Sequence, residues 1–308
     1  MFEALRRIPR KEKVAIGLSI GTGILLLAIK FAAYWITESS AIFSDAVESI
    51  VNVMASMVAL WALAAAHTPP DEKHPYGHGK AEFLSAAFEG GMIGIAAIFI
   101  FVGTLSHIFF HQQEPKELVV GIVLMVAAMA VNGAIGFGLV RMGKTQKSAT
   151  LEADGWHLLT DAVTSAAVLV ALALVKLTGQ SWFDPAVAFL IAGYVGWTGL
   201  HVARESFGGL MDVQDVEDEK ALIAILDRHV GKRGAQPQIC SYHKLRHRHS
   251  GRYHWVDFHI MVPAHLNVAE GHRIASEIEY EMEQMLGEGN ATAHIEPCGS
   301  DVCEICGS

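Results

Sequence analysis

Six long apolar stretches dominate the first two thirds of the chain. Each is as long as the roughly 20 mostly apolar residues that a membrane-spanning helix needs, and they cover about residues 14–36, 40–66, 81–110, 117–141, 149–177 and 183–207. A basic segment precedes the first stretch, as in a signal peptide, but that stretch is too long, lacks an evident cleavage site and is followed by more spans. The sequence therefore predicts an all-α membrane domain of six transmembrane helices over residues 1–211, with the first helix retained.

Lys and Arg residues give this domain an orientation. They gather before the first stretch, in the loop after the second and in the loop after the fourth. With six spans, these three segments lie on the same side of the membrane. Because Lys and Arg favour cytoplasmic loops, we expect both termini and everything after residue 211 in the cytoplasm.

The residues after 211 differ in composition from the apolar part. Nine of the 16 His and all 4 Cys lie there, and the whole chain carries a net charge of −9. A negative chain of this kind is not expected to bind nucleic acid. A cytoplasmic domain does not need disulfides, so its Cys residues are expected to be thiols or metal ligands.

Two of the apolar stretches carry polar residues in a matching pattern. The second contains Asp45, Glu48 and Asn52, and the fifth contains Asp154, His157 and Asp161 at the same spacing. Residues four apart share one face of a helix, so these two helices could present Glu48, Asn52, His157 and Asp161, with Asp45 nearby, to one divalent metal ion. A buried polar residue can also serve only to join neighbouring helices. Helix contacts or interface anchors are what we expect of the other intramembrane polar residues, Lys30, Glu89, Asn132, Arg204 and Glu205.

The loop after the second stretch holds a second candidate site. A tight turn through Pro75 and Gly77 would bring Asp71, His74 and His78 together. Imidazole and carboxylate groups are typical ligands of zinc and neighbouring metals. The spacing of two His residues four apart also occurs without a metal, so both interpretations stay open.

These features together resemble the cation diffusion facilitator family along essentially the whole chain. The resemblance rests on the stretch HPYGHGKAE, the paired sites in the second and fifth stretches, the six spans and the His-rich tail. It implies a homodimeric exporter in the lipid bilayer of a bacterial inner membrane, which moves Zn²⁺ or a similar divalent metal out of the cytoplasm in exchange for protons by alternating access.

The resemblance also implies roles for particular residues. The transport site would be Glu48, Asn52, His157 and Asp161, and the loop site would be Asp71, His74 and His78. A lysine after the loop pairs near the dimer axis with an Asp after the sixth helix in this family, which here corresponds to Lys80 and Asp212.

One departure from the family pattern concerns the metal. Family members usually have Asp or His, then Asp, where this chain has Glu48 and Asn52. An amide can supply a carbonyl oxygen but neither a charge nor a proton. Proton exchange would then depend on His157 with Glu48 or Asp161. Fe, Co, Ni, Mn and Cd therefore stand beside Zn²⁺ as candidate cargo.

The C-terminal part, residues 212–297, has the pattern of a small α+β domain. Residues 217–230 and 268–287 predict amphipathic helices, and residues 238–248, 252–263 and 291–296 predict strands, with a hairpin turn at Ser250 and Gly251. The order is αββαβ. The resemblance implies a metallochaperone-like domain that dimerises and senses metal through His243, His259, His272, His294 and Glu296.

The tail, residues 298–308, contains Cys298, Cys303 and Cys306. Their spacing is found in some iron–sulfur proteins, which need a fourth ligand, and Cys240 is the available one. A soft-metal site and a flexible reduced tail are the alternatives.

Two other classes of protein could use such residues. A membrane di-metal oxidase or hydroxylase has similar motifs but needs many His residues at helix ends, and here only His74 and His78 qualify. A metal sensor without transport is the second. An intramembrane metalloprotease is disfavoured because no HExxH motif occurs. We expect a transporter and not an enzyme.

Overall fold

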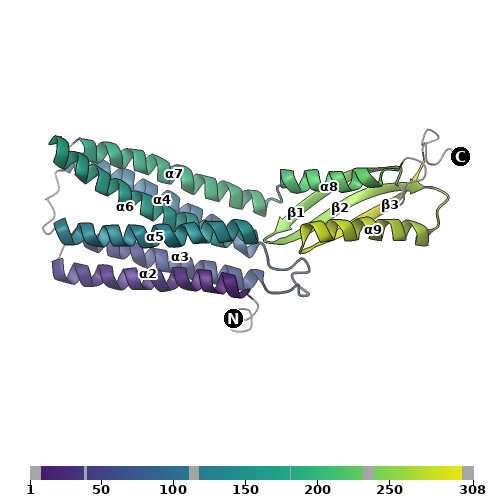
Figure 1. Ribbon diagram of the computed structural model, residues 1–308, viewed down its shortest axis with the longest axis horizontal. Coiled ribbons are helices and arrows are strands. Elements are labelled where there is room, and N and C mark those ends of the chain that lie inside the picture. Colours follow the sequence, from purple (N-terminus) through teal and green to yellow (C-terminus); the bar gives the residue numbers. More distant parts are fainter. Residues whose placement is uncertain (1–7, 38–39, 111–117, 181, 232–238, 300–308) are drawn as a thin grey trace. The chain divides into compact units, whose positions relative to one another are not determined.

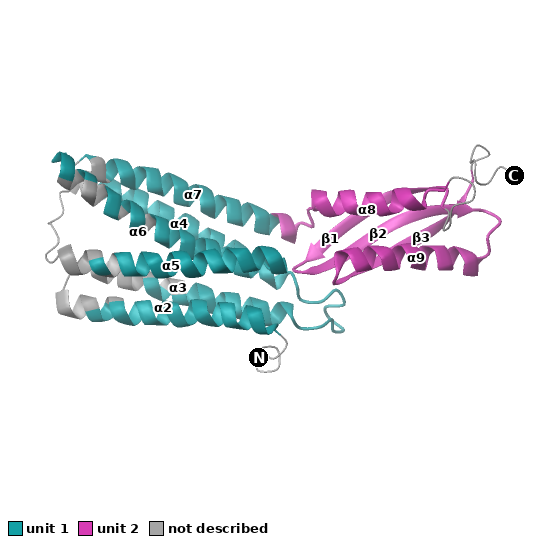
Figure 2. Cartoon of the chain, viewed as in Figure 1, with its two compact units in different colours: residues 1–207 teal, residues 208–308 magenta. Residues whose placement is uncertain are grey.

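The computed structural model describes residues 8–37, 40–110, 118–180, 182–231 and 239–299 (Figure 1). The chain divides into two compact units, unit 1 (residues 1–207) and unit 2 (residues 208–308), which are coloured separately in Figure 2. Unit 1 contains the apolar stretches, and unit 2 contains the part that is rich in His and Cys.

Each apolar stretch of the sequence coincides with one long helix. The helices are α2 (Arg10–Thr37), α3 (Ser40–Ala66), α4 (Ala81–Phe110), α5 (Leu118–Gln146), α6 (Ala149–Thr178) and α7 (Phe183–Leu210). They begin and end within about five residues of the expected positions. α2, α5 and α7 extend further at their ends than the apolar stretches, because helical hydrogen bonding continues into the polar flanks.

Four of these helices are long and apolar enough to cross a membrane, judged over the described residues. Their apolar parts are Arg10–Ile29, Ala81–Ser106, Val126–Gln146 and Pro185–Leu210. α3 contributes a shorter apolar part, Val53–Ala66. The six predicted spans are therefore not confirmed: six long helices form, and four of them meet the length and apolarity criteria within the described residues.

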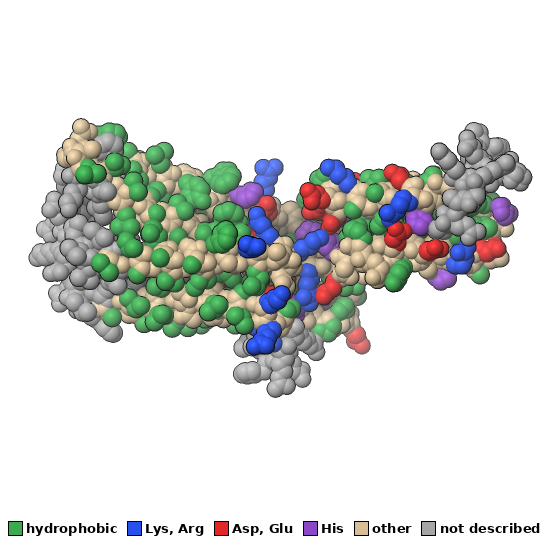
Figure 3. Space-filling view, in the orientation of Figure 1, with side chains coloured by type: hydrophobic (Ala, Val, Ile, Leu, Met, Phe, Trp, Pro, Cys, Tyr) green, Lys and Arg blue, Asp and Glu red, His purple; other side chains and the backbone are tan. Residues whose placement is uncertain are grey.

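Large apolar side chains cover the outside of unit 1. Phe99, Leu190 and Leu200 are 73%, 76% and 73% exposed. Figure 3 shows hydrophobic side chains along the helices and Lys and Arg side chains near one end of them. Water-soluble proteins rarely expose so much contiguous apolar surface, whereas lipid tails cover it favourably. Unit 1 is a membrane domain.

Glycines allow the helices of unit 1 to approach closely. A Cβ atom added to Gly136 on α5 would lie 2.9 Å from the carbonyl oxygen of Gly155 on α6. α4 and α7 meet in the same way, since a Cβ atom on Gly90 would lie 2.7 Å from the amide nitrogen of Ala203. Small residues at such contacts are a common device of membrane helix packing. They hold α6, which carries His157, directly against α5.

Gly136→Ala is expected to destabilise the membrane domain by about 1–3 kcal/mol, the usual cost of overpacking, because its methyl group would meet the backbone of α6. Gly138→Ala on the same helix is the matched control, since no described atom lies within 4 Å of a Cβ atom built there. Thermal unfolding of the purified variants in detergent measures the difference. Equal unfolding midpoints for the two variants would contradict the close contact.

Unit 2 has the predicted order of elements. It contains α8 (Val216–His229), β1 (Ser241–Ser250), β2 (Tyr253–Pro263), α9 (Val268–Leu286) and β3 (Gly289–Cys298). Asp215 caps α8 by accepting hydrogen bonds from the backbone amides of Glu217 and Asp218, and Asn267 forms a capping box with Glu270 at the start of α9. Gly251 supplies the positive φ of 60° in the hairpin turn.

The three strands form one sheet in the order β1-β2-β3. β1 and β2 are antiparallel, whereas β2 and β3 are parallel. The two strands are parallel because α9 returns the chain to the end of the sheet at which β2 begins. β3 is longer than predicted and includes Cys298, which pairs with Pro263 and is 8% exposed. Cys298 thus belongs to the sheet and not to a separate tail.

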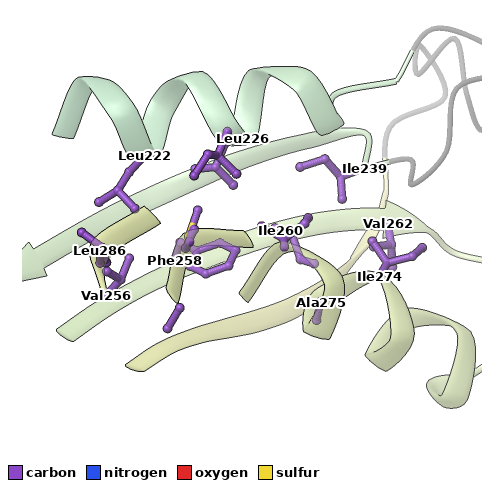
Figure 4. Close-up of a cluster of buried hydrophobic side chains, with 14 residues drawn as sticks. Leu222, Leu226, Ile239, Val256, Phe258, Ile260, Val262, Ile274, Ala275 and Leu286 are labelled. Carbon is purple, nitrogen blue, oxygen red and sulfur yellow. The ribbon is translucent and has the colours of Figure 1, made fainter. Parts of the chain in front are cut away.

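The core of unit 2 lies on one face of this sheet (Figure 4). Val256, Phe258 and Ile260 alternate along β2 and are at most 1% exposed. They pack against Leu222, Leu226, Ile274, Ile278 and Met282 from α8 and α9. Because side chains alternate along a strand, the residues between them on β2, among them His259, belong to the opposite face of the sheet.

Strand β1 buries one imidazole on the core side. His247 pairs with Val256 and is 4% exposed. Burial lowers its pKa below the ordinary value, and the carboxylates of Asp218, Glu219 and Asp215 at the start of α8 counteract this only in part. His247 is therefore neutral at pH 7 in the folded unit.

Acidification is expected to destabilise unit 2 through His247. Above a pH of about 6.5 this imidazole is neutral in both the folded and the unfolded chain. Below it, the unfolded chain takes up the proton first, so the free energy of unfolding falls as the pH falls. Hydrogen exchange of β1 and β2 in the full chain between pH 7.5 and 5.5 measures the loss. His247→Gln should show a weaker pH dependence, and an unchanged profile in this variant would refute the assignment.

Candidate metal sites

The loop between α3 and α4 brings Asp71, His74 and His78 together. The backbone amides of Asp71 and His74 each donate to the carbonyl oxygen of the other residue, both at 3.2 Å. The amide of Gly77, whose φ is 79°, donates to the carbonyl of His74 at 2.9 Å. These bonds close a compact turn. One ligand atom from each of the three side chains lies within 4.8 Å of the others.

Asp71 is the centre of this loop group. Its Oδ1 accepts hydrogen bonds from the backbone amides of Lys73 and His74, and its Oδ1 lies 3.0 Å from Nδ1 of His74. Its Oδ2 lies 3.6 Å from Nε2 of His78. The hydrogen bond from the His74 amide lowers the pKa of Asp71, so the carboxylate is ionised at neutral pH. A carboxylate with two imidazoles is a suitable partial ligand set for Zn²⁺ and similar ions.

The end of this loop is tied to the start of α6. Glu82, in the first turn of α4, is 2% exposed and accepts a hydrogen bond from the hydroxyl of Ser148. Thr150 adds a hydrogen bond to the backbone carbonyl of Glu82 at 3.4 Å. The loop group and the helix that carries His157 are therefore held together at one end of unit 1.

A second group lies in unit 2, across all three strands. His243 pairs with His259, and His259 pairs with His294, so one imidazole from each strand stands in the same row. The ring centroids of His243 and His259 are 5.0 Å apart, and those of His259 and His294 are 4.6 Å apart. The row lies on the open face of the sheet, opposite the core.

Glu296 completes this sheet group. Its Oε1 lies 2.7 Å from Nδ1 of His259, and its Oε2 lies 3.4 Å from Nε2 of His243. The side chain of His294 is 66% exposed, and its Nε2 lies 3.8 Å from Oε1 of Glu296. The hydrogen bond from His259 lowers the pKa of Glu296, so an ionised carboxylate faces three imidazoles. Ligand atoms of His243, His259 and Glu296 lie within 4.8 Å of one another.

A β-bulge makes the row possible. The register of β1 against β2 shifts between His243 and Arg246, and Lys244 has a positive φ of 51°. Without the extra residue, His243 and His247 would share one face. With it, His243 faces the open side and His247 the core. His272 on α9 is exposed, and the structure does not bring it to this group.

The predicted transport site is only partly within the described structure. The side chains of Asp45, Glu48 and Asn52 on α3 lie outside the described residues. On α6, His157 is 6% exposed and Asp161 is half-buried. They are one helical turn apart, which places them on one face of α6. The four-residue site in the membrane remains a prediction.

Two further predictions have no test in this structure. Lys80 belongs to unit 1 and Asp212 to unit 2, where Asp212 accepts a hydrogen bond from Arg248 at 3.3 Å. Their pairing near a dimer axis remains a prediction. Cys303 and Cys306 lie outside the described residues, so the Cys-rich metal site remains a prediction as well.

Sequence reasoning did not connect two acidic residues of the membrane domain with each other. Glu89 on α4 and Asp154 on α6 are 0% and 1% exposed and interact electrostatically. Glu89 was expected to be a helix contact or an interface anchor. Its position as an acidic residue within an apolar helix was the available signal, but its partner on another helix could not be read from the sequence.

Both parts of the chain match known family models. Residues 16–211 match the cation efflux transmembrane domain, and residues 233–298 match the cytoplasmic domain of cation efflux proteins, a dimer domain by its model name. The uncharacterized transporter sll1263 of Synechocystis sp. is 37% identical over 280 residues, which cover 91% of this chain and 88% of that protein. The cation-efflux pump FieF of Cronobacter sakazakii is 31% identical over 280 residues, 89% of each chain.

A solved structure also shares sequence with this chain. CzrB in its zinc form is 26% identical, and the match covers 28% of this chain and 92% of the CzrB chain. The TM-score of 0.25 is too low for the overall folds to be compared. The transmembrane family model and these two relatives, which match about nine tenths of the chain, show the family. The chain belongs to the cation efflux family of membrane transporters, also called cation diffusion facilitators.

Proposed function

We propose that this protein is a proton-coupled antiporter that exports a divalent transition metal from the cytoplasm of a bacterial cell. Zn²⁺, Fe²⁺, Co²⁺, Ni²⁺, Mn²⁺ and Cd²⁺ are the candidate cargo. The observation that carries the proposal is the burial of His157, with Asp161 one turn further, on a helix of an apolar membrane domain. Ionisable groups are costly inside a membrane and mark ion pathways.

The transport site in this proposal consists of Glu48, Asn52, His157 and Asp161, with Asp45 close by. Two ionised carboxylates and one neutral imidazole would match the charge of a divalent cation. Protonation of His157 and of a carboxylate from the outer side would release the ion. The family relationship and the printed name of FieF as a cation-efflux pump support this direction of transport.

The two groups outside the membrane have separate roles. We assign Asp71, His74 and His78 to capture of metal near the entrance, because the loop is tied through Glu82 to the helix with the transport residues. We assign His243, His259, His294 and Glu296 to sensing of cytoplasmic metal, and Cys303 and Cys306 in the tail to a soft-metal arm.

The assembly is proposed to be a homodimer in the bacterial inner membrane. Both termini would face the cytoplasm, in line with the distribution of Lys and Arg. The match of unit 2 to a dimer-domain family model supports the dimer. Lys80 and Asp212 would form the charge interlock near the dimer axis, and metal bound in unit 2 would tighten the dimer.

Reconstituted vesicles test the proposal. The purified chain is placed in liposomes with a metal-sensitive dye and an acidic lumen, and each candidate metal is added outside at a higher pH. We expect uptake that depends on the pH gradient and stops when a protonophore collapses it. Uptake that ignores the gradient would contradict antiport, and uptake of none of the six metals would point to a sensor without transport.

A further inference from the structure

Two buried carboxyl groups lie on contacting helices of the membrane domain, apart from the transport residues. Glu89 comes from α4 and Asp154 from α6, two helices that lie in contact (Figure 1). Glu89 is fully buried and Asp154 is 1% exposed. Their charges interact across the helix contact, and Asp154 also interacts electrostatically with His157.

Few donors satisfy these carboxyl groups. The hydroxyl of Ser56 on α3 donates to Oδ1 of Asp154 at 3.1 Å, and the hydroxyl of Ser19 on α2 lies 3.3 Å from that of Ser56. No residue within the described ranges donates a hydrogen bond to either oxygen of Glu89 or to Oδ2 of Asp154. Three buried carboxyl oxygens on two contacting helices thus have no donor within the described residues.

Burying two carboxylates in this way is unfavourable in free energy unless a positively charged group or ion neutralises them. Burying an unpaired carboxylate costs several kcal/mol or more, and two of them together cost more still. Within the described residues, no Lys or Arg contributes to the electrostatics of Glu89. A divalent cation between the two carboxylates would cancel their combined charge, and the Ser56 hydroxyl would be a neutral oxygen ligand.

Asp154 lies nearer than the transport residues to the end at which α4 and α6 begin, whereas Glu89, eight residues after the start of α4, lies about 12 Å along its helix. Glu82 and Ser148 join these two helices at that end. From the start of α6 at Ala149, a rise of 1.5 Å per residue places Asp154 about 8 Å, His157 about 12 Å and Asp161 about 18 Å along the helix. An ion moving from that end to Asp161 would therefore reach Asp154 first.

We propose that Glu89 and Asp154, with the Ser56 hydroxyl, form a second intramembrane binding site for one divalent cation, in addition to the transport site. Its ligands are all oxygen, which favours Mn²⁺ and other hard cations over soft ones. Its place as a station on the way to the transport site rests on the proposed function, whereas cation binding by the pair does not.

Mn²⁺ binding tests this site directly. The full chain in nanodiscs is titrated with Mn²⁺, and the signal of free Mn²⁺ in electron paramagnetic resonance gives the number of ions bound per chain. Glu89→Gln keeps the shape of the side chain but removes its charge, and we expect it to bind one Mn²⁺ fewer than the wild type. Glu89→Asp should retain the ion with weaker affinity, which separates loss of the ligand from misfolding.

A matched control and a second variant complete the design. Glu205→Gln on α7, where the side chain is 61% exposed, should leave the number unchanged. Asp161→Asn should remove a different ion, so the double variant Glu89→Gln/Asp161→Asn should lose two. If the wild type shows no transport, and Glu89→Gln still binds one Mn²⁺ fewer than the wild type, the proposed function fails and the site stands. Equal binding by Glu89→Gln and the wild type would overturn the site.

Discussion

Asp161→Ala is expected to abolish metal uptake driven by a pH gradient in proteoliposomes, to below about 1% of the wild-type rate. The substitution removes one carboxylate from a proposed site of four ligands. The charge left on the site would no longer balance a divalent ion, and leaving one partner of a buried charged group unpaired typically costs 3–5 kcal/mol. That free energy corresponds to a loss of binding of more than about 100-fold.

Thr160→Val is the matched control for this variant. Thr160 precedes Asp161 on α6, is 4% exposed and donates its hydroxyl hydrogen bond to the carbonyl of Trp156 in its own helix. Its replacement by the isosteric Val should keep most of the transport activity. Wild-type flux in Asp161→Ala would remove this residue from the transport site. Zn²⁺ binding in unit 2 should be equal in both variants, which verifies that they are folded.

His259→Ala is expected to weaken the binding of Zn²⁺ to unit 2 by at least about 100-fold. Removing a residue that only hydrogen-bonds to a metal ligand typically lowers the metal affinity about 10–100-fold. His259 is itself a proposed ligand, so its loss should have a larger effect. It stands between His243 and His294 and is 2.7 Å from Glu296. Its removal leaves the remaining groups without their middle ligand.

Calorimetric titration of the full chain with Zn²⁺ measures this affinity. The titration uses a His74→Ala background, so that the loop group does not contribute. His265→Ala serves as the control, because His265 is exposed in the turn between β2 and α9. Equal affinities of the His259→Ala and His265→Ala variants would show that the sheet group is not a zinc site. Loss of dimerisation on its own would instead assign His259 to the subunit contact.

The family and the order of elements could be derived from the sequence because they depend on local patterns. Apolar length predicts membrane helices, and a turn at Gly251 between two alternating runs predicts a hairpin. The resemblance to cation diffusion facilitators is confirmed by the family models and the relatives. The loop group was predicted from spacing, since Asp71 and His78 are separated by only six residues and a single turn joins them.

Other features depended on contacts between distant segments. The row of His243, His259 and His294 depends on the register of three strands. The position of His243 in this row also depends on a β-bulge that the residue types in β1 do not predict. The four-residue site in the membrane is still untested, because the α3 side chains lie outside the described residues. The six spans were expected from apolar length, and four of the six helices qualify within the described residues.

The sequence by itself determined which segments are helices and strands, which face of each is apolar, and which ligands lie close along the chain. These properties follow from the periodicity of side chains within one element. Only the tertiary structure decided that Glu89 on α4 and Asp154 on α6 are buried on contacting helices, and that Glu296 on β3 hydrogen-bonds with His259 on β2. Such pairs form because helix packing and strand register bring separate elements together, and the position of one element against another is not encoded in the pattern of either.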